Sequence, residues 1–219
     1  MKSFVVIGMG RFGTAVAKKL TELGHEVLAV DKEEHNIQGV TDIVTHAVIA
    51  DATEERNLKA LGLRNYDCAI LAIGDNLADS VLTALALKEM GIKEIICKAR
   101  DVQHKKILLK VGADYVIIPE VEAGAKLAIR LADLNLIEFT ELDNNFGVSE
   151  MYVPGRWVGK SIQQIHVRQK YGSTIVAIKR RQSEDDIIVA PGADYIFAEG
   201  DILVLVGESE AASLLGQLK

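Results

Sequence analysis

This chain of 219 residues contains few of the residues that build disulfide frameworks or metal centres. Its two cysteines, Cys68 and Cys97, each lie in a short apolar run and are expected to be buried as small hydrophobic residues. The five histidines show neither the CxxC nor the HxxxH spacing of a metal site. The composition therefore gives no indication of a structural metal or a redox centre.

The chain also lacks an excess of positive charge and a long apolar run. Its 25 basic residues are outnumbered by 31 acidic ones, which gives a net charge of −6. A nucleic-acid-binding surface needs a basic stripe to neutralise phosphates, so we expect no nucleic-acid partner. No apolar stretch approaches the roughly 18 to 20 residues that span a bilayer, and no signal peptide is visible. We therefore expect a soluble, cytoplasmic protein.

Short β-branched runs alternate with helical patterns up to about residue 135, which is typical of βαβ units and a parallel sheet buried on both faces. The expected strands cover 4–8, 27–30, 46–50, 67–73, 94–98 and 115–118. The expected helices cover 11–23, 33–40, 54–61, 76–90, 102–111 and 121–135. Residues 1–135 are therefore expected to form an α/β domain with a doubly wound parallel sheet of the Rossmann type.

The rhythm changes after residue 135. Residues 136–146 are polar and are interpreted as a linker or crossover. Alternating segments follow, with strands expected over 147–153, 174–180, 187–190 and 201–206 and helices over 161–165 and 209–218. Residues 147–219 are therefore expected to form a small α+β domain, with an antiparallel sheet.

A glycine-rich turn follows the first expected strand. Gly8 allows the tight turn into the helix, Gly10 lets backbone N–H groups approach a diphosphate, and Gly13 lets the helix pack closely on the strand. Asp31 ends the second expected strand, where a carboxylate accepts hydrogen bonds from ribose hydroxyls. This pattern predicts an adenine-nucleotide site; the alternative is a glycine turn that only packs.

Ligands of open α/β sheets bind at the carboxyl ends of the strands. The residues that end the later strands are Asp51, Ala52, Ile73, Gly74, Asp75, Lys98, Ala99, Arg100 and Glu120. Lys98 and Arg100, together with Arg11 in the glycine turn, would place three cations around one anion site, although strand-end lysines and arginines can also be solubilising residues. Glu120 would repel a polyphosphate unless Mg²⁺ or Ca²⁺ bridged the two; otherwise it is a solvated carboxylate.

A dehydrogenase would need a group that handles a proton while hydride moves. The second domain offers His166, which has no partner carboxylate nearby in sequence and is expected to be a surface or half-buried histidine. We therefore favour a nucleotide sensor without enzymatic activity. The alternative is an NAD-dependent oxidoreductase.

Several segments closely resemble the cytosolic subunits of bacterial Ktr/Trk potassium uptake systems, of the KtrA/TrkA type. They are FVVIGMGRFG at 4–13, HAVIADATEE at 46–55, LAIGDN at 71–76, VGADYVIIPE at 111–120, VR at 167–168, KYG at 170–172 and ILVLVG at 202–207. The resemblance spans nearly the whole chain.

This resemblance implies a regulatory RCK protein (regulator of K⁺ conductance). Such proteins form homodimers that assemble into an octameric ring, which docks on a Ktr/Trk-type membrane potassium-translocating subunit at the inner face of the cell membrane. ATP and ADP, and in some members NAD(H), compete for the cleft, and the bound nucleotide alters gating. A nucleotide-dependent scaffold without a channel is a further alternative.

The resemblance also carries residue roles. Arg11 matches the arginine that meets the terminal phosphates, Asp31 the ribose acid, and Glu120 a carboxylate that helps bind a divalent cation. The cleft lining corresponds to Lys32, Glu33, Asp51, Ala52, Ile73, Gly74, Asp75, Lys98, Ala99, Arg100 and His104. Glu33 stands where one branch of the family has an asparagine near the ribose.

In several Gram-positive members the C-terminal domain binds cyclic di-AMP across its dimer interface. Parts of that pocket correspond to Ile162, Val167, Arg168 and Pro191, and Arg168 could pair with phosphate. This sequence departs from the family pattern at His166, which replaces an aspartate, at Gln163, which replaces an aliphatic residue, and at Thr174, which replaces an asparagine in some relatives. Because the other four positions match, cyclic di-AMP is retained as a candidate second ligand.

Overall fold

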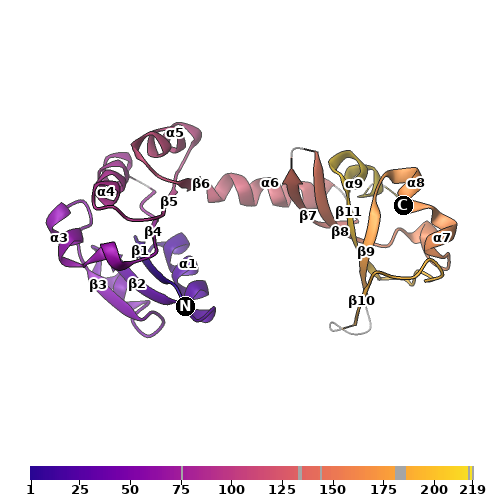
Figure 1. Cartoon of the computed structure of the whole chain (residues 1–219), viewed down its shortest axis with the longest axis horizontal. Coiled ribbons are helices and arrows are strands. Elements are labelled where there is room, and N and C mark those ends of the chain that lie inside the picture. The colour runs from indigo at the N-terminus through magenta and orange to yellow at the C-terminus, as the bar shows by residue number, and fades with distance from the viewer. Residues whose placement is uncertain (75, 133–134, 144, 181–185, 217, 219) are drawn as a thin grey trace. The chain divides into compact units, whose positions relative to one another are not determined.

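The computed structural model describes residues 1–74, 76–132, 135–143, 145–180, 186–216 and 218. The chain divides into two compact units, Met1–Val121 and Glu122–Lys219 (Figure 1). Among the helices of the described ranges, none combines the length and the apolar character needed to cross a bilayer.

The first unit contains a parallel six-stranded sheet with strand order β3-β2-β1-β4-β5-β6. Its strands are β1 (Ser3–Ile7), β2 (Glu26–Asp31), β3 (His46–Ile49), β4 (Cys68–Leu71), β5 (Ile95–Lys98) and β6 (Tyr115–Ile117). Its helices are α1 (Arg11–Glu22), α2 (Glu34–Gln38), α3 (Glu55–Ala60), η1 (Leu63–Asn65), α4 (Leu77–Glu89) and α5 (Val102–Val111), and α6 (Pro119–Ala132) follows β6. The predicted doubly wound parallel sheet is confirmed.

Apolar residues on both faces of the strands account for this arrangement. In β1, Val5 and Ile7 pack into a core cluster that includes Leu87 of α4. Val6 points to the other face and packs with Ala17 of α1. Helices therefore pack against both faces of the sheet and cover them from solvent. The strand order reverses at β1, so a crevice is expected at the carboxyl end of this strand.

The second unit is built on an antiparallel five-stranded sheet with strand order β10-β9-β11-β8-β7. Its elements are β7 (Leu136–Asp143), β8 (Phe146–Tyr152), η2 (Gly155–Trp157), α7 (Ile162–Ile165), α8 (Val167–Tyr171), β9 (Thr174–Lys179), β10 (Ile187–Val189), β11 (Ile202–Glu208) and α9 (Ser209–Gly216). Alternate residues of the strands, such as Leu203 and Leu205, are fully buried with Trp157 and Phe197. The predicted small α+β domain with an antiparallel sheet is confirmed.

Strand β7 occupies most of the segment that the sequence predicted as a polar linker, and that interpretation is wrong. Leu136 pairs with Met151 and Thr140 with Val148, in antiparallel register with β8. β7 lies at the edge of its sheet, and only Leu136 is buried, so the strand can be polar along most of its length. Residue 144, also in the predicted linker, lies outside the described residues.

Two helices also differ from the sequence prediction. Helix α8 was not predicted, because five residues after an αL histidine carry little periodic signal. Helix α6 begins at Pro119, a residue well suited to the first helical position, two residues before the predicted start. Glu120 therefore lies in the first turn of α6 rather than at the end of β6. The predicted helices 121–135 and 209–218 include residues 133–134 and 217, which lie outside the described residues.

Candidate functional site

The glycine turn after β1 is held in place by the carboxylate of Asp31, which is only 9% exposed. The Met9 N–H donates to Asp31 Oδ2 at 2.5 Å, and the Glu33 N–H donates to Asp31 Oδ1 at 2.8 Å. The Gly8 N–H donates to the Val30 carbonyl at 2.8 Å. The turn and the end of β2 are therefore tied together, with Asp31 as the common acceptor.

The three glycines of the turn have different structural roles. Gly8 has φ of +96°, in the region that favours glycine. A Cβ on Gly13 would lie 1.9 Å from the Gly8 carbonyl oxygen, so only glycine lets α1 pack this closely. A Cβ on Gly10 would meet nothing within 4 Å, and no side chain caps the first turn of α1. Gly10 therefore leaves open space at a helix N-terminus, which is suited to an anion.

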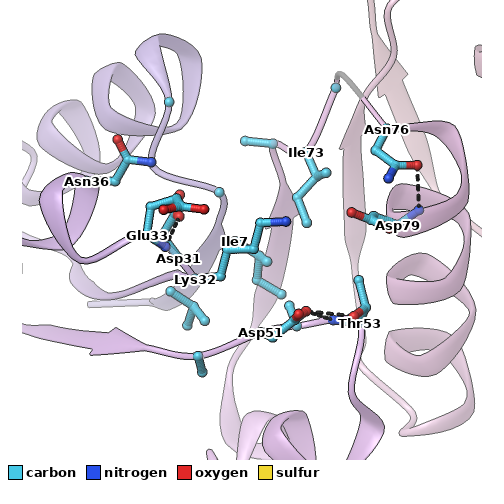
Figure 2. Close-up of a pocket in the computed structure, with 17 residues that line it drawn as sticks. Ile7, Asp31, Lys32, Glu33, Asn36, Asp51, Thr53, Ile73, Asn76 and Asp79 are labelled. Carbon is cyan, nitrogen blue, oxygen red and sulfur yellow. Dashed lines mark hydrogen bonds between the residues drawn. The ribbon is translucent and has the colours of Figure 1, made fainter.

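A pocket of about 310 Å³ lies at the carboxyl ends of β1 to β4 (Figure 2). The residues that were predicted from the sequence and that line it are Gly8, Gly10, Asp31, Lys32, Glu33, Asp51, Ala52, Ile73 and Gly74. Asp75, also predicted, lies outside the described residues. The structure thus brings together, in one pocket, residues from four separate strand ends.

Sequence reasoning missed several residues that line this pocket. They are Ile7, Val30, Asn36, Ala50, Thr53, Ala72, Asn76 and Asp79. Asn76 is the N-cap of α4, and its Oδ1 accepts the Ala78 N–H at 2.9 Å and the Asp79 N–H at 3.3 Å, so an asparagine just before a helical pattern is a signal that could have found it. The sequence carried no comparable signal for Asn36, because it lies inside a short helix.

The polar lining of the pocket is dominated by carboxylates. Figure 2 shows Asp31 and Glu33 on one side and Asp51 and Asp79 on the other. Asp51 Oδ1 accepts hydrogen bonds from the Thr53 hydroxyl at 2.6 Å and the Thr53 N–H at 2.9 Å, and these bonds lower the pKa of Asp51. Among the described lining residues Lys32 is the one cation. Such a pocket suits ligand hydroxyl groups, which donate hydrogen bonds to carboxylates.

The cations predicted to rim the phosphate site do not line this pocket. Arg11 is exposed at the start of α1, and Arg100 is exposed with its Nε 3.0 Å from Asp101 Oδ2. The side chain of Lys98 is 17% exposed and lies beside Gly74, because a Cβ on Gly74 would come within 3.2 Å of Lys98 Cε. None of the three side chains is among the described lining of the pocket, although Arg11 and Lys98 both lie near enough to Glu120 to influence its carboxylate.

Glu120 pairs with Lys98, with 3.3 Å between Lys98 Nζ and Glu120 Oε1. The pKa of Glu120 is lowered, first by a hydrogen bond from its own backbone N–H and then by Lys98, with a further contribution from Arg11. Within the described ranges there is no group of three or more His, Cys, Asp or Glu side chains that could hold a metal ion. A cation at Glu120 would therefore need oxygen ligands from another molecule.

Ala99 and His104 are buried and do not line the pocket, although the resemblance implied it. The Arg100 N–H donates to His104 Nδ1 at 3.4 Å, so Nε2 carries the proton and donates to Ser80 Oγ at 2.7 Å. Burial lowers the pKa of His104, which favours this neutral form. His104 thus joins the loop after β5 to helix α4 instead of meeting a ligand.

A second pocket, of about 270 Å³, lies in the C-terminal unit between α7, α8 and β9. All four residues predicted for a cyclic di-AMP site line it: Ile162, Val167, Arg168 and Pro191. The other lining residues are Gln163, His166, Gln169, Ser173, Thr174 and Ile175. Its described lining contains no carboxylate, in contrast to the first pocket.

Comparisons with known proteins agree with this two-unit arrangement. The model of the TrkA-N domain family matches residues 4–119, and that of the TrkA-C domain family matches residues 148–218. The Ktr system potassium uptake protein A of Bacillus subtilis is 44% identical over 209 residues, covering 95% of this chain and 93% of that protein. It is named for potassium uptake and not as an enzyme.

Two solved structures share the fold. The GsuK channel bound to NAD has a TM-score of 0.66 at 18% identity, over 98% of this chain and 39% of that one. The structure of GsuK bound to ADP has a TM-score of 0.53 at 18% identity, over 59% of this chain and 34% of that one. This chain thus corresponds to well under half of the length of these structures.

The different roles of Gly13 and Gly10 give a matched pair of substitutions. We expect Gly13→Ala to lower the free energy of unfolding by about 1–3 kcal/mol, because its Cβ would force α1 away from the Gly8 carbonyl. Gly10→Ala should change it by less than about 0.5 kcal/mol, since its Cβ has open space. Urea unfolding measures both. Equal losses for the two variants would contradict the assigned packing.

Proposed function

The chain belongs to the family of Ktr and Trk potassium uptake proteins built from a TrkA-N and a TrkA-C domain, and we propose that it is a regulatory subunit that binds an adenine nucleotide and so controls a membrane potassium-translocating subunit. The observation that carries this proposal is the pocket over the glycine turn, with Asp31 at its side. It offers a phosphate cradle and ribose acceptors in one place.

ATP and ADP are the proposed ligands, with NAD(H) as a third. The ribose would meet the carboxylates of Asp31 and Glu33, and the diphosphate would lie over Gly10 at the start of α1. The apolar lining residue Ile73, which is only partly buried, offers a surface on which a base can pack. The structures of GsuK bound to NAD and to ADP support this class of ligand.

Arg11 is the residue proposed to distinguish ATP from ADP. It lies at the mouth of the turn and is exposed, and its interaction within the described residues is the electrostatic one with Glu120. It is therefore available to the terminal phosphate of a nucleotide in its own subunit or in a neighbouring one. A nucleotide shifts a conformational equilibrium only by its differential affinity, so a contact made to one phosphate can change the favoured shape.

A divalent cation, Mg²⁺ or Ca²⁺, is proposed at Glu120 when a nucleotide is bound. Glu120 is exposed, and its salt bridge with Lys98 engages one carboxylate oxygen. A terminal phosphate would attract Lys98 and would also supply the oxygen ligands that the chain itself does not gather around Glu120. The Glu120 carboxylate would then contact the metal ion in place of the Lys98 ammonium group.

The proposed assembly is a homodimer that builds an octameric ring and docks on a Ktr/Trk-type membrane subunit at the inner face of the membrane. Helix α6 exposes Val121, Leu127 and Leu131, which are 59%, 57% and 73% accessible in the single chain. Leu127 and Leu131 are four residues apart, so they lie on one face of the helix and are available to a partner subunit. Such a protein would be cytoplasmic and peripheral, held at the membrane by its partner.

An NAD-dependent oxidoreductase is the weaker candidate. Hydride transfer needs a proton-handling side chain over the pocket, and the described lining includes neither histidine nor tyrosine. It does include Lys32 and several carboxylates, but Asp31 accepts the backbone N–H groups of Met9 and Glu33, and Asp51 accepts the N–H and the hydroxyl group of Thr53. His104, the nearest histidine in the predicted set, is buried in a structural network. A nucleotide-dependent scaffold fits the same pocket but predicts no effect on potassium flux.

Cyclic di-AMP is proposed as the ligand of the C-terminal pocket. Ile162, Val167, Arg168 and Pro191 lie around one hollow, and Arg168 supplies a guanidinium suited to a phosphodiester. The absence of carboxylates from its described lining removes a source of repulsion. Across a dimer interface, two such pockets would offer two arginines to the two phosphates.

We expect Arg11→Ala to raise the Kd for ATP about tenfold and that for ADP less than about twofold, because only ATP carries the phosphate that this guanidinium would meet. Titration calorimetry with each nucleotide measures the difference. Lys18→Ala, on the exposed face of the same helix, is the matched control and should change neither value. Equal losses for ATP and ADP would refute the discriminating role.

The regulatory role predicts a nucleotide-dependent potassium flux. The chain should co-purify with a multi-spanning potassium transporter, and liposomes holding both proteins should differ in K⁺ flux between ATP and ADP. Gly10→Ala should abolish this difference while the protein stays folded, since its Cβ fills the space proposed for the diphosphate. Identical fluxes in ATP, in ADP and without nucleotide would favour a scaffold.

We expect Arg168→Ala to weaken cyclic di-AMP binding by about tenfold or more, through loss of a charge-assisted contact to phosphate. Lys170→Ala is a suitable control, because Lys170 lies on the same helix but does not line the pocket. Calorimetry on the full chain measures both. A similar small loss in the two variants would show that general surface charge, rather than this pocket, attracts the ligand.

A further inference from the structure

His166 joins helices α7 and α8 through its backbone. It has φ of 56° and ψ of 44°, a left-handed conformation that is uncommon for a residue other than glycine. Its N–H donates to the Ile162 carbonyl at 3.2 Å, and its carbonyl accepts the N–H groups of Gln169 and Lys170, both at 3.0 Å. The end of one helix and the start of the next therefore fix the position of its Cα.

The side chain of His166, by contrast, is available to a ligand. It is exposed and lines the C-terminal pocket. Its imidazole makes no hydrogen bond or ion pair with any residue in the described part of the chain. The backbone thus holds an unpaired titratable group at the pocket wall.

Apart from His166 itself, the charged side chain in the described lining of this pocket is that of Arg168. Arg168 of α8 also lines the pocket, whereas β9 contributes Thr174 and Ile175 and the loop after β10 contributes Pro191, all uncharged. Lys170 on α8 and Asp194 after β10 are the nearest charged residues along these elements, and neither lines the pocket. A bound anion would therefore meet Arg168 at every pH and a second cation only when His166 is protonated.

We propose that His166 makes the C-terminal pocket pH-sensitive, so that it binds a phosphate-bearing ligand more tightly as the pH falls from about 8 to about 6. This inference rests on the proposed function of that pocket. Histidine is the side chain whose charge ordinarily changes in this range, and a protonated imidazole makes a stronger hydrogen bond to phosphate than a neutral one. By linkage, binding of the ligand at intermediate pH takes up protons.

The test is calorimetry of cyclic di-AMP with the full chain at about pH 6 and about pH 8, at constant ionic strength. We expect the Kd of the unmodified protein to be about five- to tenfold lower at the acidic pH. His166→Asn should reduce this ratio to less than about twofold, since asparagine is neutral and tolerates the left-handed conformation. His46→Asn, at an exposed histidine of the first unit, should leave the ratio unchanged.

Titration in two buffers of different ionisation enthalpy should reveal proton uptake in the unmodified protein and none in His166→Asn. His166→Gly, which relaxes the backbone and also removes the imidazole, serves as a second variant should thermal melting show that asparagine unfolds the junction. An equal pH ratio in the unmodified protein and the variants overturns the role of His166. Absence of cyclic di-AMP binding at both pH values overturns the proposed ligand, and this inference with it.

Discussion

The nucleotide-type pocket depends on one buried carboxylate. Asp31 accepts the Met9 N–H with one oxygen and the Glu33 N–H with the other, so a single side chain fixes the glycine turn and the loop after β2. Hydrogen bonds from backbone amides to a carboxylate are strong and directional, and burial strengthens them further. The glycine turn at Met9 and the loop at Glu33 are therefore both held by this carboxylate, beside the open space above Gly10.

The rest of the pocket follows from the helical connections of the parallel sheet. A helix between successive strands makes the strands run parallel and covers the faces of the sheet, and parallel strands place their carboxyl ends at one edge. Contacts between helices and loops then fix the positions of these ends: Thr83 of α4 donates to the Ala52 carbonyl at 3.3 Å, and His104 links the loop after β5 to Ser80. Thr83, Ser80 and His104 thus hold the backbone of the strand-end loops in place.

The two units carry pockets of opposite electrical character. In the first, Asp31, Glu33, Asp51 and Asp79 line the pocket together with Lys32, whereas the second is lined by Arg168 and His166 without a described carboxylate. Carboxylates accept hydrogen bonds from hydroxyl groups, whereas guanidinium and imidazolium groups bind phosphates. In the first unit Arg11, Lys98 and Arg100 are not part of the described pocket lining, and Lys98 and Arg100 are paired with Glu120 and Asp101.

The sequence by itself determined the parallel sheet, the glycine turn and the position of Asp31, because these depend on local periodicity and on spacing along one βαβ unit. Only the tertiary structure decided the strand β7, the pairing of Lys98 with Glu120 and the burial of His104. Each of these depends on a partner distant in sequence: β8 for the edge strand, the start of α6 for Lys98, and Ser80 of α4 for His104. A pattern within one segment holds no information about which distant element will lie beside it, so packing alone sets these contacts.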